Sequence, residues 1–368
     1  MNFEAHMAAL PPSEAEAFRA IAGQLRSLRE REPSPHLTDR ILAAVDAERQ
    51  HERRCRNRAP WWGVAAAAAA LVAAVSYFWT ASSAAPADPV QTGLAWLAAN
   101  QEANGTWSPA KHGGAEVYRP ALTALSALAL DRDEKGRYAA QIQRACEALS
   151  GLQGREGAFG GEGRARLYNH AITTFALASL CPRHPALRPA LDRALAYVGA
   201  QQTVQGGWDY EPNSEGNAAL TSWQVRALAC AEAQGFDAAK VPLRKGLRWL
   251  RSVTRDDGSI AYHQGSSARS DGLTALAAYA LITAGKEFAG LQEIGRHAVG
   301  SLKSSPQASP VADCYRDYAK VMAFESAGDT AQADTVRRQM QTQKSQVDQW
   351  GSVGGKLYTA AFTVLAAR

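Results

Sequence analysis

The chain has 368 residues, of which 46% are hydrophobic and 20% charged, and its formal net charge is +5. This length allows one large domain with an appendage, or two ordinary domains. The composition is typical of a soluble protein. The positive charge is small and dispersed, and no basic stripe is interleaved with aromatic residues, so nucleic acid is not an expected partner.

Five cysteines are present, and they form no CxxC pair and no spacing typical of a metal finger. Four of them could pair in an oxidising compartment, but their separations do not say which. We favour inert buried thiols and expect neither a metal nor a cofactor. The five are Cys55, Cys146, Cys181, Cys230 and Cys314.

Residues 1–60 have a polar, helical pattern. A Pro-Ser-Pro break at 33–35 precedes Thr38, which can cap a helix with one apolar face. Because this is too little apolar surface for an independent core, we expect a cytoplasmic helical arm that folds fully only on a protein partner or a membrane. The arm ends in a group of arginines: Arg49, Arg53, Arg54, Arg56 and Arg58.

Residues 61–79 read WWGVAAAAAALVAAVSYFW and contain no charge. At 1.5 Å per residue such a helix is about 28 Å long, close to the hydrocarbon thickness of a bilayer. Aromatic residues stand at both ends of the span, as at membrane interfaces. A transmembrane helix is the favoured interpretation, and a buried Ala-rich helix is the alternative.

Positive charge lies on one side of this span only. Five arginines precede it, and no Lys or Arg occurs between Arg58 and Lys111, which predicts a cytoplasmic amino terminus. We therefore expect an uncleaved signal anchor, a linker at 80–90 and an extracytoplasmic domain over 91–368. The chain would be a single-pass protein of the inner membrane with its C-terminal domain in the periplasm.

A short element recurs beyond the linker, in QEANGTW, QGREGAF, QTVQGGW and TRDDGSI. Each copy follows an amphipathic segment, which is consistent with a helix that ends at a glycine turn. The fifth copy is replaced by residues 304–309, and a sixth survives loosely around Gln346 and Trp350. The glycines, at spacings of 52, 49 and 52, are Gly105, Gly157, Gly206 and Gly258.

A second element follows each copy of the first and opens a run dense in alanine and leucine, such as Leu122 to Leu130. A helix that is apolar on every face is a buried helix. Five of the six copies carry a threonine five residues after their first position. The first positions are Tyr118, Tyr168, Gly216, Arg269, Tyr315 and Tyr358.

The two elements together predict an all-α domain in which six outer amphipathic helices alternate with six inner apolar helices. A closed (α/α)6 toroid is the economical arrangement, and an open superhelix is the alternative. Closure is favoured because an open array needs polar capping repeats, whereas the last inner helix, Leu357 to Ala367, is as apolar as the others.

The QxxxGxW element before each buried helix resembles the repeat of squalene and oxidosqualene cyclases and of protein prenyltransferase β subunits. The resemblance covers about residues 90 to 368. It implies a structural role for the repeated residues, which brace neighbouring repeats, and it places function at the amino-terminal ends of the inner helices. The residues with this structural role are Gln101, Gly105, Trp107, Gln153, Gly157, Phe159, Gln202, Gly206, Trp208 and Gly258.

The family's chemistry is not matched residue by residue. Prenyltransferases hold zinc through an Asp-x-Cys-Tyr stretch and a later Tyr-His, whereas this chain has Asp313-Cys314-Tyr315 and Tyr358-Thr359. With one thiolate and no imidazole, the three-ligand site is not expected to form. The Asp-x-Asp-Asp-Thr acid of the cyclases is reduced to a single aspartate, Asp271, which lacks the neighbouring carboxylates that raise a proton donor's pKa.

The resemblance nevertheless marks a set of candidate residues at the cavity mouth. Charges near the six helix starts balance, five basic against five acidic, which suggests paired rim charges rather than an anion trap. His170 is expected near the mouth, where a structural hydrogen-bonded histidine is favoured over a general base. The candidates are Tyr118, Arg119, Tyr168, His170, Trp223, Arg269, Asp271, Asp313, Cys314, Tyr315, Tyr358 and Thr359.

Three classes of function follow. The favoured one is a membrane-anchored, non-catalytic toroid that binds, senses or scaffolds, with an apolar or isoprenoid compound as the candidate ligand. The second is an enzyme of the terpenoid cyclase or prenyltransferase type, or a glycan-acting enzyme. The third is a transmembrane regulator, because residues 33–45, the arginines and the anchor resemble the juxtamembrane part of bacterial anti-sigma factors. Their His-x-x-x-Cys-x-x-Cys zinc motif is broken here, since His51 and Cys55 are followed by Arg58.

Overall fold

The computed structural model describes residues 88–161, 163–210, 214–286, 288, 290–304, 313–342 and 355–367. They belong to one compact unit, Pro86–Arg368. The predicted arm at 1–60 and membrane helix at 61–79 lie outside the described residues, as does most of the linker at 80–90. None of the helices in the described ranges is both long enough and apolar enough to span a bilayer.

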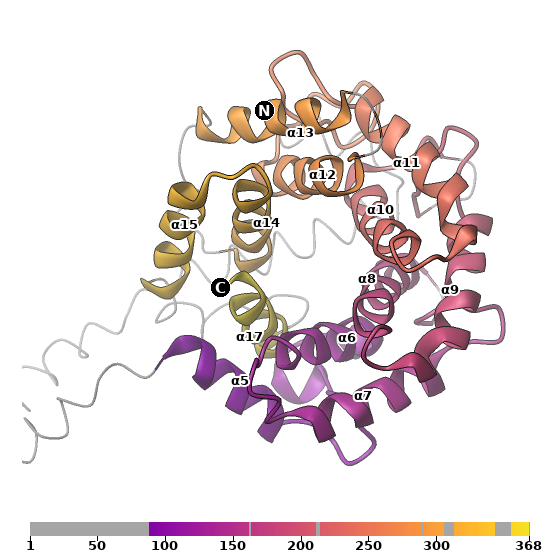
Figure 1. Ribbon diagram of the computed structural model, residues 1–368, viewed down its shortest axis with the longest axis vertical. Coiled ribbons are helices and arrows are strands. Elements are labelled where there is room, and N and C mark those ends of the chain that lie inside the picture. The colour runs from indigo at the N-terminus through magenta and orange to yellow at the C-terminus, as the bar shows by residue number, and fades with distance from the viewer. Residues whose placement is uncertain are drawn as a thin grey trace, which may run out of the picture. The chain divides into compact units, whose positions relative to one another are not determined.

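The described residues form twelve α-helices and no strands, which confirms the prediction of an all-α domain. Two sets of helices alternate along the chain, one inner and one outer (Figure 1). The inner set is α6 (Arg119–Leu130), α8 (Ala165–Leu180), α10 (Ala218–Glu232), α12 (Asp271–Ala284), α14 (Cys314–Ser326) and α17 (Gly355–Ala366). The outer set is α5 (Pro89–Ala99), α7 (Ala139–Leu152), α9 (Arg188–Ala200), α11 (Lys240–Ser252), α13 (Leu291–Lys303) and α15 (Thr330–Thr342).

The helices pack in pairs, and the pairs follow one another around a centre (Figure 1). Each inner helix contacts the next inner helix in the chain, and α17, the last, contacts α6, the first. The outer helices α7, α9, α11, α13 and α15 each pack on the inner helix that precedes them, and α5 packs on α17 and α6. Each pair therefore shares its core with the neighbouring pair.

Burial separates the two sets as the sequence predicts. In α6 every residue after Arg119 is buried, because alanine and leucine occupy all faces of the helix. In α11 a single face is buried, which includes Leu243, Leu247 and Leu250, and most of the exposed positions are lysine or arginine. An inner helix thus packs against neighbours on several sides, whereas an outer helix covers the ring with one face.

The glycine turns join one pair to the next. Gly157 has a φ of +87°, and a Cβ there would lie 2.3 Å from the carbonyl oxygen of Arg193 on α9. Gly105 has the same relationship to Arg144 on α7. Both the left-handed backbone and the close approach therefore require glycine at these turns.

A glutamine fixes three of the turns, those of Gly105, Gly157 and Gly206, against the next outer helix. Gln153 Nε2 donates to Gly157 O at 2.9 Å and to Ala190 O in α9 at 2.8 Å. Gln101 makes the same two bonds, to Gly105 O at 3.0 Å and to Gln141 O at 2.8 Å. One side chain thereby closes its own turn and joins it to the following helix pair.

The tryptophan and threonine of the repeat connect the turn to the inner helix. Trp208 is fully buried, and its Nε1 donates to Val198 O at 2.8 Å. Its backbone N–H donates to Thr221 Oγ1 on α10 at 3.0 Å. Trp107 repeats both bonds, to Leu97 O and to Thr123 Oγ1. The recurring threonine is thus an acceptor for the turn.

Candidate functional site

The first positions of the second element lie at the starts of the inner helices. They fall between two residues before the helix, as Arg269 does for α12, and the fourth helical residue, as Tyr168 and Tyr358 do in α8 and α17. Most of the candidate residues therefore lie close to one end of the inner set. Their partners decide whether this end offers reactive groups.

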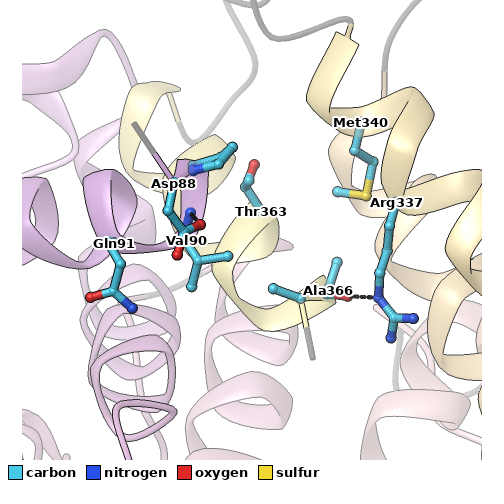
Figure 2. A pocket seen from close by; sticks show the side chains of 9 residues that line it. Asp88, Val90, Gln91, Arg337, Met340, Thr363 and Ala366 are labelled. Atoms are coloured by element: carbon cyan, nitrogen blue, oxygen red, sulfur yellow. Dashed lines mark hydrogen bonds between the residues drawn. The ribbon is translucent and has the colours of Figure 1, made fainter. Parts of the chain in front are cut away.

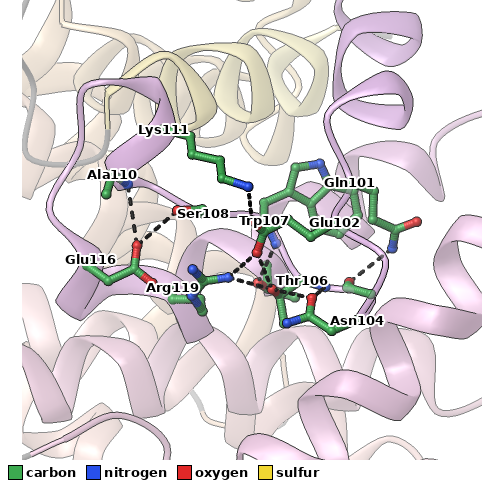
Figure 3. Close-up of polar contacts among 12 residues, drawn as sticks. Gln101, Glu102, Asn104, Thr106, Trp107, Ser108, Ala110, Lys111, Glu116 and Arg119 are labelled. Atoms are coloured by element: carbon green, nitrogen blue, oxygen red, sulfur yellow. Dashed lines mark hydrogen bonds and ion pairs between the residues drawn. The ribbon is translucent and has the colours of Figure 1, made fainter.

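Arg119, the first residue of α6, lies in a local ion-pair network (Figure 3). It pairs with Glu102 and Glu116, and its Nη1 donates to Thr106 Oγ1 at 2.7 Å. Lys111 Nζ lies 2.6 Å from Glu102 Oε1. Hydrogen bonds from Lys111 and Arg119 lower the pKa of Glu102 to about 2. Two cations and two carboxylates neutralise each other here.

The other charged candidates are paired as well. Arg269 Nη1 lies 2.9 Å from Asp257 Oδ2, and its Nη2 donates to Ser301 O at 3.2 Å. Lys320 Nζ of α14 lies 2.7 Å from Asp271 Oδ2 at the start of α12. The aspartate that matches the position of the cyclase acid is therefore held in an ion pair with a lysine of the next inner helix.

The start of α14 holds the positions that resemble a zinc site. Asp313 caps the helix, because its Oδ1 accepts from the backbone N–H of Tyr315 at 3.1 Å and of Arg316 at 3.2 Å. Cys314 Sγ lies 4.0 Å from Thr359 Oγ1 of α17. Burial raises the pKa of the Cys314 thiol to about 12. Within the described ranges, no three His, Cys, Asp or Glu side chains are grouped closely enough to hold a metal ion.

His170, one of the residues predicted at the mouth, packs against an outer helix. It is fully buried on the side of α8 that packs on α9, where its Nε2 lies 3.2 Å from Ala194 O. Its ring stacks with Phe159 and makes an edge contact with Tyr197. Burial lowers its pKa to about 3, so the imidazole is neutral. Because this inner helix is apolar on all faces, its sequence pattern does not show which face a given residue lies on.

Tyr168 lies next to a second tyrosine. Its ring centroid is 5.9 Å from that of Tyr210 in the turn before α10. Burial raises the pKa of the hydroxyls of Tyr168, Tyr210 and Tyr262, so they stay protonated.

Aromatic side chains meet across the inner helices. Trp223 Nε1 of α10 donates to Tyr315 OH of α14 at 3.1 Å, and their rings stack with centroids 6.4 Å apart. Tyr315 also contacts Tyr358 and Phe362 of α17. We refer to the following residues as the inner aromatic cluster: Phe175, Trp223, Tyr279, Tyr315, Tyr318, Tyr358 and Phe362.

The sequence identified Trp223, Tyr315 and Tyr358 but missed the rest of this cluster and the arginine inside it. Arg226, one turn beyond Trp223 on α10, is buried, and its Nη2 donates to Tyr318 OH at 2.8 Å. A signal was present in the helical spacing, because Trp223 and Arg226 are three residues apart, as are Tyr315 and Tyr318.

A separate pocket of about 360 Å³ opens between α5, α15 and α17 (Figure 2). Arg337 lines this pocket and donates from Nε to Ala366 O at 2.6 Å. Its Nη1 lies 2.9 Å from Asp334 Oδ1. Asp88 caps α5 by accepting from Val90 N. Two of the polar groups that line this pocket, Asp88 and Arg337, therefore serve the ends of α5 and α17.

The chain was compared with protein-family models and with curated proteins, and neither comparison finds a match.

Proposed function

We propose that residues 88–367 form an (α/α)6 toroid of the type found in squalene cyclases and protein prenyltransferase β subunits, and that this toroid is a non-catalytic binding module. The fold proposal is supported by the order of contacts among the inner helices, which returns from α17 to α6. It is also supported by the Gln, Gly and Trp turns, which join successive helix pairs through the same bonds.

One observation carries the functional proposal. At the starts of the inner helices, each of the groups that could perform chemistry is already engaged by another group of the protein. Asp271 pairs with Lys320, Asp313 caps its own helix, and the Cys314 thiol lies against Thr359. What the inner helices offer instead is a partly exposed aromatic surface, and aromatic faces bind apolar compounds without transforming them.

The arm and anchor extend this proposal. Residues 61–79 would hold the protein in the inner membrane with the toroid in the periplasm, and residues 1–60 would contact a cytoplasmic protein. The arginines that precede the uncharged span support this orientation. A ligand of the toroid would then come from the extracytoplasmic face of the membrane, where apolar compounds are concentrated.

A lipid-extract experiment tests the proposal. The purified full-length protein is incubated with a membrane lipid extract, and the compounds that remain bound are identified by mass spectrometry. A binding module should return one class of compound unchanged, and its binding should be saturable. The appearance of a new compound during incubation would make the protein an enzyme. Failure to retain any compound would remove the binding function.

A second candidate is transmembrane regulation, favoured by the resemblance of residues 33–45 and the adjacent arginines to anti-sigma factors. In this case the toroid senses a ligand, and the arm holds or releases a cytoplasmic partner. In-cell crosslinking from residues 1–60 tests it. Recovery of a specific cytoplasmic protein would support regulation, and recovery of membrane proteins alone would contradict it.

A further inference from the structure

Arg226 lies among aromatic rings that come from three inner helices. Its Cζ is 4.3 Å from the ring centroid of Phe175 on α8, 4.4 Å from Trp223 on α10 and 4.8 Å from Tyr279 on α12. Its Nη2 donates to Tyr318 OH on α14. Four consecutive inner helices therefore meet at one guanidinium group.

This guanidinium is buried without a counter-ion. Arg226 is 4% exposed, and among the described residues no carboxylate forms an ion pair with it. In the part of the chain that the structure describes, its Nε and Nη1 have no hydrogen-bond acceptor. The rings attract the cation through their faces, but they supply no oxygen for the remaining N–H groups. A buried charge whose N–H groups lack acceptors lowers the stability of the folded protein, and a bound partner with acceptor atoms would remove this cost.

Arginine stays charged in this environment. Burial acts to lower its pKa, but the neighbouring tyrosines outweigh burial and hold the pKa of Arg226 above its ordinary value. The missing partner is therefore an anion, or a neutral group that offers several acceptors. An anion fits better, because only an anion also compensates the charge.

Solvent reaches the surroundings of Arg226. The rings of Phe175 and Tyr279, which lie over the guanidinium, are only partly buried. One turn further along the same helices, Ser179, Cys230 and Thr283 are also partly exposed. A partly exposed surface thus continues from the guanidinium toward the carboxyl ends of α8, α10 and α12. The Trp223 and Tyr315 pair lies on the opposite side of Arg226, toward the helix starts.

The number of unpaired positive charges around Arg226 indicates which kind of anion fits. One guanidinium neutralises one negative charge, and the nearest cations on α14 are engaged, since Arg316 pairs with Asp317 and Lys320 with Asp271. A phosphate monoester or a diphosphate would bring a second, uncompensated charge into an aromatic environment. A carboxylate carries a single charge and matches the planar guanidinium.

We propose that Arg226 binds the carboxylate of an amphiphilic monoanion, whose apolar body packs on Phe175 and Tyr279 and points toward the carboxyl ends of the inner helices. This inference rests on the proposed binding function and names the ligand class. It places the charged end of the ligand at the middle of the inner helices, away from the helix starts that the resemblance marks.

The test compares ligands that differ only in the charged group. Octanoate, 1-octanol and octyl phosphate are titrated into the full-length protein by calorimetry, with thermal unfolding as a second readout. Octanoate should bind at least about tenfold more tightly than 1-octanol, since one charge-assisted contact is present only with the acid. It should also bind more tightly than octyl phosphate.

Two variants locate the site. Arg226→Met replaces the guanidinium by a shorter, unbranched apolar side chain and should lose the preference for octanoate over 1-octanol. Arg251→Met removes an exposed arginine from the outer helix α11 and should leave that preference unchanged. The Arg226→Met variant is expected to fold, because replacing an uncompensated buried charge by an apolar group is often neutral or stabilising.

The possible failures are distinguishable. Equal affinity for octanoate and 1-octanol would overturn recognition of the charge, and this comparison needs no variant. A preference that survives in Arg226→Met would also overturn the site. In both cases the toroid still binds apolar ligands and the proposed function stands. If neither octyl compound binds and the lipid extract yields no bound compound, the proposed function falls as well.

Discussion

Trp223 and Tyr315 are hydrogen-bonded between α10 and α14, two inner helices that have α12 between them in the chain. One turn further along, Arg226 and Tyr318 repeat this link between the same helices. Both pairs are 92 residues apart in sequence. The inner aromatic cluster therefore links inner helices that are not consecutive in the chain.

The first prediction concerns this link. Tyr315→Phe keeps the ring but removes the acceptor of the Trp223 indole N–H, which lies in a fully buried residue. An unsatisfied buried donor should lower the free energy of unfolding by about 1 to 2 kcal/mol. Urea unfolding measures the change. Tyr358→Phe is the control, since no bond of its hydroxyl is found within the described residues, and equal losses in the two variants would contradict the role of the bond.

The second prediction concerns the glutamine of the turns. Gln202 Nε2 donates to Gly206 O and to Pro242 O, both at 2.9 Å. Gln202→Ala should lower the free energy of unfolding by about 2 kcal/mol, because two hydrogen bonds are lost, one within the turn and one to the next helix pair. The neighbouring Gln201 is exposed, so Gln201→Ala should change it by less than about 0.5 kcal/mol. Similar values in urea unfolding would show that the glutamine does not join the repeats.

Much of the fold could be predicted from the sequence, because its signals are local. The turn around Gly105, the bonds of Gln101 and the apolar run after Arg119 all lie within about one repeat. These signals gave the number, order and burial of the helices. They do not depend on how an inner helix is rotated about its own axis.

The site depended on that rotation and could not be predicted in full. An inner helix that is apolar on all faces has no polar side to show which residues face the centre. The sequence therefore did not indicate that His170 contacts α9, and Arg226 was not recognised. The partners of Asp271 and Arg226 are also distant in sequence, since Lys320 and Tyr318 lie on another helix pair.

The third prediction separates backbone strain from close packing at two glycines. Gly157 and Gly163 have similar φ angles, +87° and +84°. A Cβ at Gly157 would lie 2.3 Å from Arg193 O, whereas a Cβ at Gly163 would meet nothing within 4 Å. Gly163→Ala should cost about 1 to 2 kcal/mol from the left-handed backbone alone. Gly157→Ala should cost at least about 1 to 3 kcal/mol more from overpacking.

The measurement is the urea unfolding midpoint of the two glycine variants under the same conditions. Equal destabilisation would mean that the turn moves away from α9 without cost. In that case the contact with Arg193 would not join the two helix pairs. A larger loss for Gly157→Ala would explain why the repeat places a glycine at this turn.

The fourth prediction concerns the pH dependence of stability through His170. Its folded-state pKa is lowered by burial from 6.5 to about 3, so between these values the unfolded chain binds a proton that the folded protein does not. Stability should therefore fall as pH decreases below 6.5, by up to about 1.4 kcal/mol per pH unit from this group. The groups around its ring, Phe159, Tyr197, Thr174 and the Ala194 carbonyl, carry no charge that would compensate the imidazolium.

Denaturation of the wild type and of His170→Gln at pH 7 and pH 5 measures this contribution. The glutamine can still donate to Ala194 O but does not titrate, so the difference between the two pH values should shrink by about 2 kcal/mol. His263→Gln removes an exposed histidine and should leave the difference unchanged. If the His170 variant keeps the full pH dependence, the imidazole is charged or accessible in the folded protein, which would contradict its position between α8 and α9.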